Sequence, residues 1–234
     1  MPSSAESDLI RALEHAKTLH QARQESPRLA AALDRVAAWQ SRRLNATYAD
    51  LARDPRYAEA IKFFQSDLYG PGDFSRRDAD LARVVPIMVR LLPDSVIATV
   101  AKAIELSALS HELDRALVAQ LGEDARLTVA SYCAAYRACE NRGDRERQIA
   151  LIVELGTALD SYVHMPLLRS ALVAMRRPSR MAGMTALQGF LERGLLSFRG
   201  MDGAAEFLAV IQTRETAVMQ TIFGGDAAPF VEPV

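Results

Sequence analysis

His111 is the residue whose neighbours are best suited to chemistry. Ser107 lies four residues before it and Asp114 three residues after it, so all three share one face if this segment is helical. A carboxylate beside an imidazole orients the ring and favours its charged form, which is the minimum requirement for general base catalysis. The sequence favours a simpler interpretation, a partly buried histidine with satisfied hydrogen bonds, because no second histidine has a fitting offset.

Asp160 and His164 form a second pair, four residues apart at an expected helix end. A cationic imidazole suits the negative end of a helix dipole, so capping accounts for this pair without catalysis. Four histidines are too few for a conventional histidine-rich zinc site. Haem needs only one axial histidine, so a haem- or metal-dependent protein using His111 or His164, such as an oxidoreductase, remains an alternative.

Residues 165–200 form the segment best suited to binding a ligand or partner. They carry six arginines against a single acidic residue, Glu192, although the whole chain has 28 basic and 29 acidic residues. Four methionines add flexible apolar side chains that adapt to irregular partners. The binding residues predicted here are Arg169, Met175, Arg176, Arg177 and Arg180.

Such a surface could bind an acyl chain with an anionic head, an anionic membrane face or an acidic helix. The alternative is a short helix that covers the core and keeps its arginines solvated, and the sequence does not separate the two. Nucleic acid is a weaker expectation, because the charges of the chain nearly cancel and no aromatic stacking platform adjoins the arginines.

A second candidate surface is the corner formed by residues 63–80. Its aromatic residues, among them Phe63 and Tyr69, precede a glycine-proline turn and a dense set of arginine and aspartate residues. The functional interpretation is the wall of a ligand pocket. The structural interpretation, a helical corner held by local ion pairs, is favoured.

The same corner carries a family resemblance. Residues 63–71 read FFQSDLYGP and resemble the signature of the bacterial FFLEELY-motif proteins, and the similarity continues at 73–80, 91–93, 147–149, 190–194 and 214–215. Gln65 and Ser66 stand where the family name has leucine and glutamate. The family is named for its motif and not for an activity, so the resemblance implies one all-helical domain and no mechanism.

Several classes of site and segment are missing from the sequence. It has neither a G-x-x-x-x-G-K-[ST] nor a G-x-G-x-x-G phosphate loop, so no phosphate-loop nucleotide site is predicted. No catalytic residue is assigned, and the cofactor is unknown. The start of the chain lacks the features of a signal peptide, and the longest apolar run, residues 84–92, is too short to cross a bilayer. Cys133 and Cys139 are expected about 9 Å apart along one helix, which favours reduced thiols and a cytoplasmic location.

Helical spacing recurs along the whole chain, and no segment alternates at period two as a strand would. The expected fold is all-α, a single bundle of about nine helices over residues 1–223 with a flexible tail over residues 224–234. A helix over residues 94–121 should be central, because its apolar residues cover more than one face. The second helix should run over 27–54, and residues 141–143 should separate two later helices.

These features predict a non-enzymatic protein that binds an apolar or anionic ligand or a partner helix. The haem- or metal-dependent protein is the alternative. Catalysis stays undecided because catalytic residues can be scattered among helices without a linear motif, and the sequence gives no oligomeric state.

Overall fold

A computed structural model describes residues 3–63, 93–165, 170, 172–181, 183, 185–226 and 229–232. Two of the predicted binding residues, Tyr69 and Arg169, lie outside these ranges, as does most of the FFQSDLYGP segment. The described residues form ten helices and no strand, which confirms the predicted all-α fold. No helix among them is long and apolar enough to cross a membrane.

The ten helices vary widely in length. They are α1 (Ser4–Glu25), α2 (Pro27–Thr47), α3 (Ala49–Arg53), α4 (Ala58–Phe63), α6 (Asp94–Leu121), α7 (Val129–Ala138), α8 (Arg142–Val163), α10 (Arg176–Met181), α11 (Thr185–Arg199) and α12 (Ala205–Phe223).

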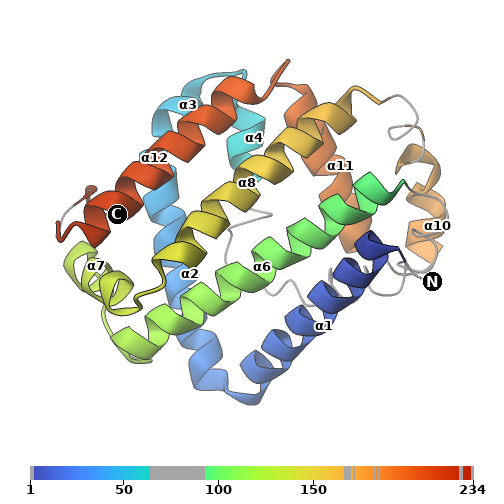
Figure 1. The fold of residues 1–234 in the computed structure, drawn as a ribbon. Coiled ribbons are helices and arrows are strands. Elements are labelled where there is room, and N and C mark those ends of the chain that lie inside the picture. The colour runs from blue at the N-terminus through green and yellow to red at the C-terminus, as the bar shows by residue number, and fades with distance from the viewer. Residues whose placement is uncertain are drawn as a thin grey trace.

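Four of the long helices lie side by side in one layer, in the order α1, α6, α8 and α12 (Figure 1). Helices α1, α6 and α12 run in one direction and α8 runs in the opposite direction. Behind this layer, α2 packs against α6 and α11 packs against α8. At one end of the bundle, α7 packs against both α6 and α12. Side chains from α2, α7, α8 and α12 meet in the interior.

Helix α6 occupies the central position predicted for residues 94–121. It packs against α1, α2, α7 and α8, and its buried side chains include Leu113 and Leu117. The helix begins directly after Pro93 and ends at Gly122, whose φ of 85° lies in the region that favours glycine. Both predicted boundaries are therefore confirmed.

Two other predicted boundaries are wrong. The helix expected over 27–54 ends at Thr47, because Tyr48 has φ −111° and ψ 19° and separates α2 from α3. The separator between α7 and α8 expected at 141–143 is also misplaced, since Gly143 lies in the first turn of α8. The chain turns between the two helices at Glu140, which has a φ of 51°.

The buried apolar side chains of the described residues form three clusters. One contains Trp39 and Met219, a second contains Ile61 and Phe207, and a third lies between α1 and α6. The last described residues reach the first cluster, where the ring of Phe230 lies 5.9 Å from that of Trp39. Flexibility of residues 224–234 concerns motion and stays a prediction.

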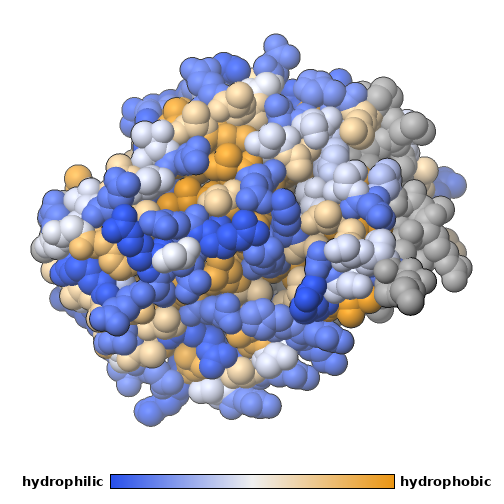
Figure 2. Space-filling model, in the orientation of Figure 1, coloured by the Kyte–Doolittle hydropathy of each residue, from blue (hydrophilic) through white to orange (hydrophobic). Residues whose placement is uncertain are grey.

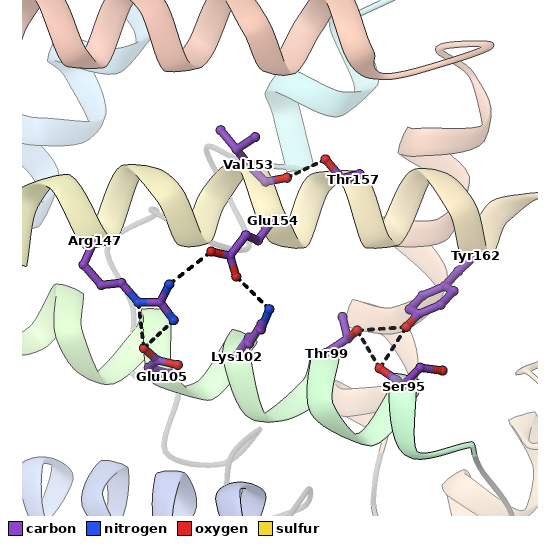
Figure 3. A network of polar contacts seen from close by, with 9 residues as sticks. All are labelled: Ser95, Thr99, Lys102, Glu105, Arg147, Val153, Glu154, Thr157 and Tyr162. Carbon is purple, nitrogen blue, oxygen red and sulfur yellow. Dashed lines mark hydrogen bonds and ion pairs between the residues drawn. The ribbon is translucent and has the colours of Figure 1, made fainter. Parts of the chain in front are cut away.

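A network of ion pairs connects the exposed faces of α6 and α8 (Figure 3). Arg147 contacts Glu105 (3.0 Å) and Glu154 (3.1 Å), and Lys102 contacts Glu154 (2.7 Å). Because all four side chains are well exposed, each pair contributes at most about 1 kcal/mol. The network aligns the two helices at the surface.

Gly156 permits a close approach of α8 to α12. A Cβ atom at this position would lie 2.3 Å from Cδ2 of Leu208, which is buried and has little room to move. We expect Gly156→Ala to lower the free energy of unfolding by about 1–3 kcal/mol, as overpacked cores do. Urea denaturation measures this difference.

Gly143→Ala is the matched control in the same helix, because a Cβ atom there would meet nothing within 4 Å. It should leave the free energy of unfolding unchanged or raise it by up to about 1 kcal/mol. Equal effects of the two substitutions would contradict a tight α8–α12 contact.

Candidate functional site

A cavity of about 90 Å³ lies between α2, α7, α8 and α12. Its aliphatic wall comes largely from α8 and α12 and includes Ile149, Ile152, Ile211 and Ile222. Where these two helices run side by side, Figure 2 shows a strip of hydrophobic side chains bordered by hydrophilic ones. The polar lining residues come from α2, α7, α8 and α12, so four separate parts of the chain meet here.

Arg43 and Glu215 form a largely buried ion pair across the cavity. Arg43 donates from Nη1 to Oε1 of Glu215 (2.7 Å) and from Nη2 to Oε2 (2.9 Å), which is a bidentate geometry. The hydroxyl of Tyr48 donates to the same Oε1 atom (2.8 Å). This pair joins α2 to α12, and Tyr48 contributes from the break between α2 and α3.

Both pKa values of the pair are shifted towards the ionised forms. Burial acts to raise the pKa of Glu215, but the charge of Arg43 and the hydrogen bonds from Arg43 and Tyr48 outweigh it and lower that pKa. Burial likewise acts to lower the pKa of Arg43, and the charge and hydrogen bonds of Glu215 raise it instead. Each residue therefore neutralises the other.

Arg145 is the second cation of the cavity wall, and its situation is different. Its side chain projects from the first turn of α8, is only 5% exposed, and lies with its Cζ atom 4.3 Å from the ring centre of Tyr136. Among the described residues, no acceptor lies within hydrogen-bonding distance of its Nε or Nη2 atom. Arg145 thus lacks the bidentate carboxylate that Arg43 has.

Other buried polar atoms near the cavity are also without partners among the described residues. Two are donors on α2, namely the Nε atom of Arg43 and the indole Nε1 atom of Trp39. The ring of Trp39 lies 4.5 Å from that of Tyr132. One is an acceptor, the Oδ1 atom of Asn141, which lies one helical turn before Arg145. Donors outnumber acceptors in this set, so the cavity region favours a group that offers acceptor oxygens.

Tyr132 and Tyr136 line the cavity from α7. Burial raises the pKa of both hydroxyl groups, although the charges of Arg145 and Arg43 act to lower it. Both hydroxyls therefore stay protonated at neutral pH and are able to donate a hydrogen bond. The two rings also form the aromatic side of the cavity.

Asp114 lies beside this region on α6. Its Oδ1 atom accepts a hydrogen bond from Nε2 of Gln40 (2.9 Å), a residue that lines the cavity. Burial raises the pKa of Asp114 to about 6, while the charge of Arg145 and the hydrogen bond from Gln40 act to lower it. Its carboxyl group is therefore partly protonated close to neutral pH.

Among the predicted binding residues, those that the structure describes do not line this cavity. Phe63 is buried and its ring packs 5.4 Å from that of Phe190, so it is a core residue. Arg176 makes a bidentate ion pair with Glu192 (2.8 and 3.0 Å). Three other predicted residues, Met175, Arg177 and Arg180, are exposed near α10.

The two histidines of the haem or metal alternative lie on different helices. The ring of His111 on α6 packs edge-on against His20 at 5.5 Å, and His164 is the exposed C-cap residue of α8. No group of three or more His, Cys, Asp or Glu side chains is arranged to hold a metal ion within the ranges that the structure describes. Cys133 and Cys139 are both free thiols.

Arg43, Arg145 and Glu215 were not predicted as site residues, although the sequence holds a signal for each. A charged residue stands at a helical spacing that otherwise carries apolar residues: Arg43 four after Trp39, Arg145 four before Ile149, and Glu215 four after Ile211. Two of the segments that resemble the FFLEELY-motif family, 147–149 and 214–215, also contribute Gln148, Ile149 and Glu215 to the cavity.

The fold and the cavity together define an all-helical protein with a partly buried, partly cationic site. Residues 19–229 match the family described as a domain of unknown function, DUF8198, and the chain belongs to this family. No curated protein and no solved structure matches the chain. The matched region contains all four helices that enclose the cavity.

Glu215→Gln tests the buried ion pair. The substitution leaves the charge of Arg43 buried without a counter-charge, so we expect a loss of about 3–5 kcal/mol in the free energy of unfolding. Asp50→Asn is the control, because Asp50 forms a bidentate pair with the neighbouring Arg214 but is 56% exposed. Its loss should be at most about 1 kcal/mol in the same urea titration at pH 7, and similar losses would contradict the account.

Asp114→Asn tests the burial of the carboxyl group. The folded pKa of about 6 lies above the unfolded value of about 3.9, so the folded state binds more protons between these values and stability falls as the pH rises through them. The variant should be more stable than the natural protein at pH 8, by up to about 3 kcal/mol, and this gain should vanish near pH 4. Urea titrations at several pH values measure the free energy of unfolding of both proteins. A difference between them that does not depend on pH would contradict the raised pKa of Asp114.

Proposed function

We propose that this protein binds a small, partly apolar anion in the cavity between α2, α7, α8 and α12. The observation that carries the proposal is Arg145, a cation that is 5% exposed and whose Nε and Nη2 atoms have no acceptor among the described residues. The charge of the nearby Asp114 acts on Arg145, but a buried guanidinium whose N–H groups lack acceptors still costs several kcal/mol. A bound anion would supply the missing acceptors and a closer counter-charge, and the isoleucines of α8 and α12 would contact its apolar part.

The proposal keeps the predicted class of function, a non-enzymatic binding protein, and assigns it to other residues. The surface at Arg176, Arg177, Arg180 and Met175 remains a separate proposal for a partner or membrane. Its exposed methionine supports it, whereas the ion pair between Arg176 and Glu192 reduces the charge available there. A haem or metal site at His111 or His164 also remains a proposal and has no specific contact in its favour.

Two further points of identity are proposals as well. Equating this family with the bacterial FFLEELY-motif proteins is supported by the similar segments between residues 63 and 215, which all lie within the matched residues 19–229. A cytoplasmic location is supported by the free thiols of Cys133 and Cys139, which fit a reducing compartment.

Trp39 offers a direct probe of binding, since it is the only tryptophan of the chain and its ring contacts Tyr132 on the cavity wall. We expect carboxylates, phosphonates or sulfonates of up to about six non-hydrogen atoms to change its fluorescence saturably. The same anions should raise the melting temperature, because a ligand at 100 times its Kd stabilises the folded state by about 2.7 kcal/mol. Neutral analogues should do neither.

Arg145→Met removes the charge while keeping a long apolar side chain. It should abolish the anion response, and the ligand-free variant should be as stable as the natural protein or more stable, because an unpaired buried charge has been removed. The lost contact with Tyr136 offsets about 0.5–2 kcal/mol of that gain.

Arg42→Met is the matched control, because Arg42 lies on the exposed face of α2 and the substitution is the same. It should leave the response of Trp39 fluorescence unchanged. The proposed function would be contradicted if no anion affected the natural protein, or if Arg145→Met and Arg42→Met responded alike.

A further inference from the structure

The charges on the cavity wall indicate what charge the ligand carries. Arg43 and Arg145 contribute two positive charges and Glu215 contributes one negative charge, which leaves a single positive charge on the lining residues. Asp114 lies beside the cavity wall and its charge also acts on Arg145 when it is ionised, so a monoanion is the largest ligand charge that the site can neutralise. A dianion would leave a buried negative charge close to Glu215, which is unfavourable in a shielded site.

The unpartnered atoms of Arg145 indicate the shape of the anionic group. The Nε and Nη2 atoms of a guanidinium carry two parallel N–H bonds on one edge, and this spacing matches the two oxygens of a carboxylate. In Arg145 these are the two atoms that have no acceptor within the described part of the chain. In Arg43 the fork formed by Nη1 and Nη2 is already occupied by the carboxylate of Glu215.

The same pattern occurs once within the site itself. The Arg43–Glu215 pair shows that this cavity accommodates a carboxylate held by a guanidinium fork at 2.7 and 2.9 Å. A tetrahedral phosphate would present three oxygens and up to two negative charges to one remaining fork. A planar carboxylate would use both N–H bonds of that fork and leave no donor or charge of Arg145 unsatisfied on that edge.

The volume and the walls limit the rest of the ligand. A cavity of about 150 Å³ holds the six carbon atoms of benzene, and one bound water needs about 15 Å³ of cavity space. By these two measures a cavity of about 90 Å³ suits about four to six non-hydrogen atoms. Three of these belong to the carboxylate group. The others form a short alkyl group, because the isoleucines of α8 and α12 also line the cavity.

Building on the proposed function, we infer that the ligand is a short-chain aliphatic monocarboxylate of about three or four carbons. Its carboxylate binds the Nε–Nη2 edge of Arg145. Its alkyl group packs against Ile149, Ile152 and Ile211.

The first experiment compares three probes of equal size on the full chain: isobutyrate, isobutyramide and ethylphosphonate. Titrations followed by Trp39 fluorescence at fixed pH and ionic strength should give a Kd for isobutyrate at least about tenfold below that for ethylphosphonate. Isobutyramide, which has the same shape without the charge, should not bind. Tighter binding of ethylphosphonate would overturn the carboxylate inference and leave the proposed function standing, whereas no response to either anion would remove both.

The second experiment separates the fork from the charge. Arg145→Lys keeps a long cationic side chain but has no planar fork, so the Kd for isobutyrate should rise at least about tenfold. Arg42→Lys, the same change at an exposed position, should leave the Kd unchanged, and circular dichroism should show intact helices in both variants. Unchanged isobutyrate binding by Arg145→Lys would overturn the assignment of the carboxylate to the fork.

Discussion

The buried ion pair between Arg43 and Glu215 is the interaction on which the cavity depends. It fixes α2 to α12 through two hydrogen bonds of 2.7 and 2.9 Å, and Tyr48 adds a third contact at the point where α2 ends. A pair of this kind requires space for two long side chains in the middle of an otherwise apolar bundle. The cavity beside the pair is lined by polar, aliphatic and aromatic side chains from α2, α7, α8 and α12. Loss of either partner leaves a buried charge without compensation.

Arg145 shows the opposite arrangement in the same cavity. It stacks on Tyr136, has little contact with water, and keeps two N–H groups without an acceptor within the described residues. Replacement of such a cation by an apolar side chain of similar length is expected to be neutral or stabilising. Residues that lower stability are retained where binding needs them, and this trade-off connects the energetics of the fold to its proposed function.

The fold could be predicted from the sequence much better than the site. The bounds of α6 follow from Pro93 and Gly122, which act locally. At the break between α2 and α3, in contrast, Tyr48 donates a hydrogen bond to Glu215, 167 residues away, and no local pattern reports this contact. The cavity residues come from separate helices, so no linear motif reports them. The arginines of residues 165–200 are clustered in the sequence and therefore give the stronger signal for a binding site. The sequence does show that Arg43, Arg145 and Glu215 each stand within the apolar stripe of a predicted helix. It does not show that the three side chains lie close together in the fold.

The most direct test of the account is a crystal structure of the protein grown with isobutyrate. The account predicts a carboxylate in the cavity, with its two oxygens about 2.7–2.9 Å from Nε and Nη2 of Arg145. Its alkyl group should lie against the isoleucines of α8 and α12. A cavity that contains only water, or a fork of Arg145 closed on Asn141 or Asp114 in the presence of saturating isobutyrate, would contradict it.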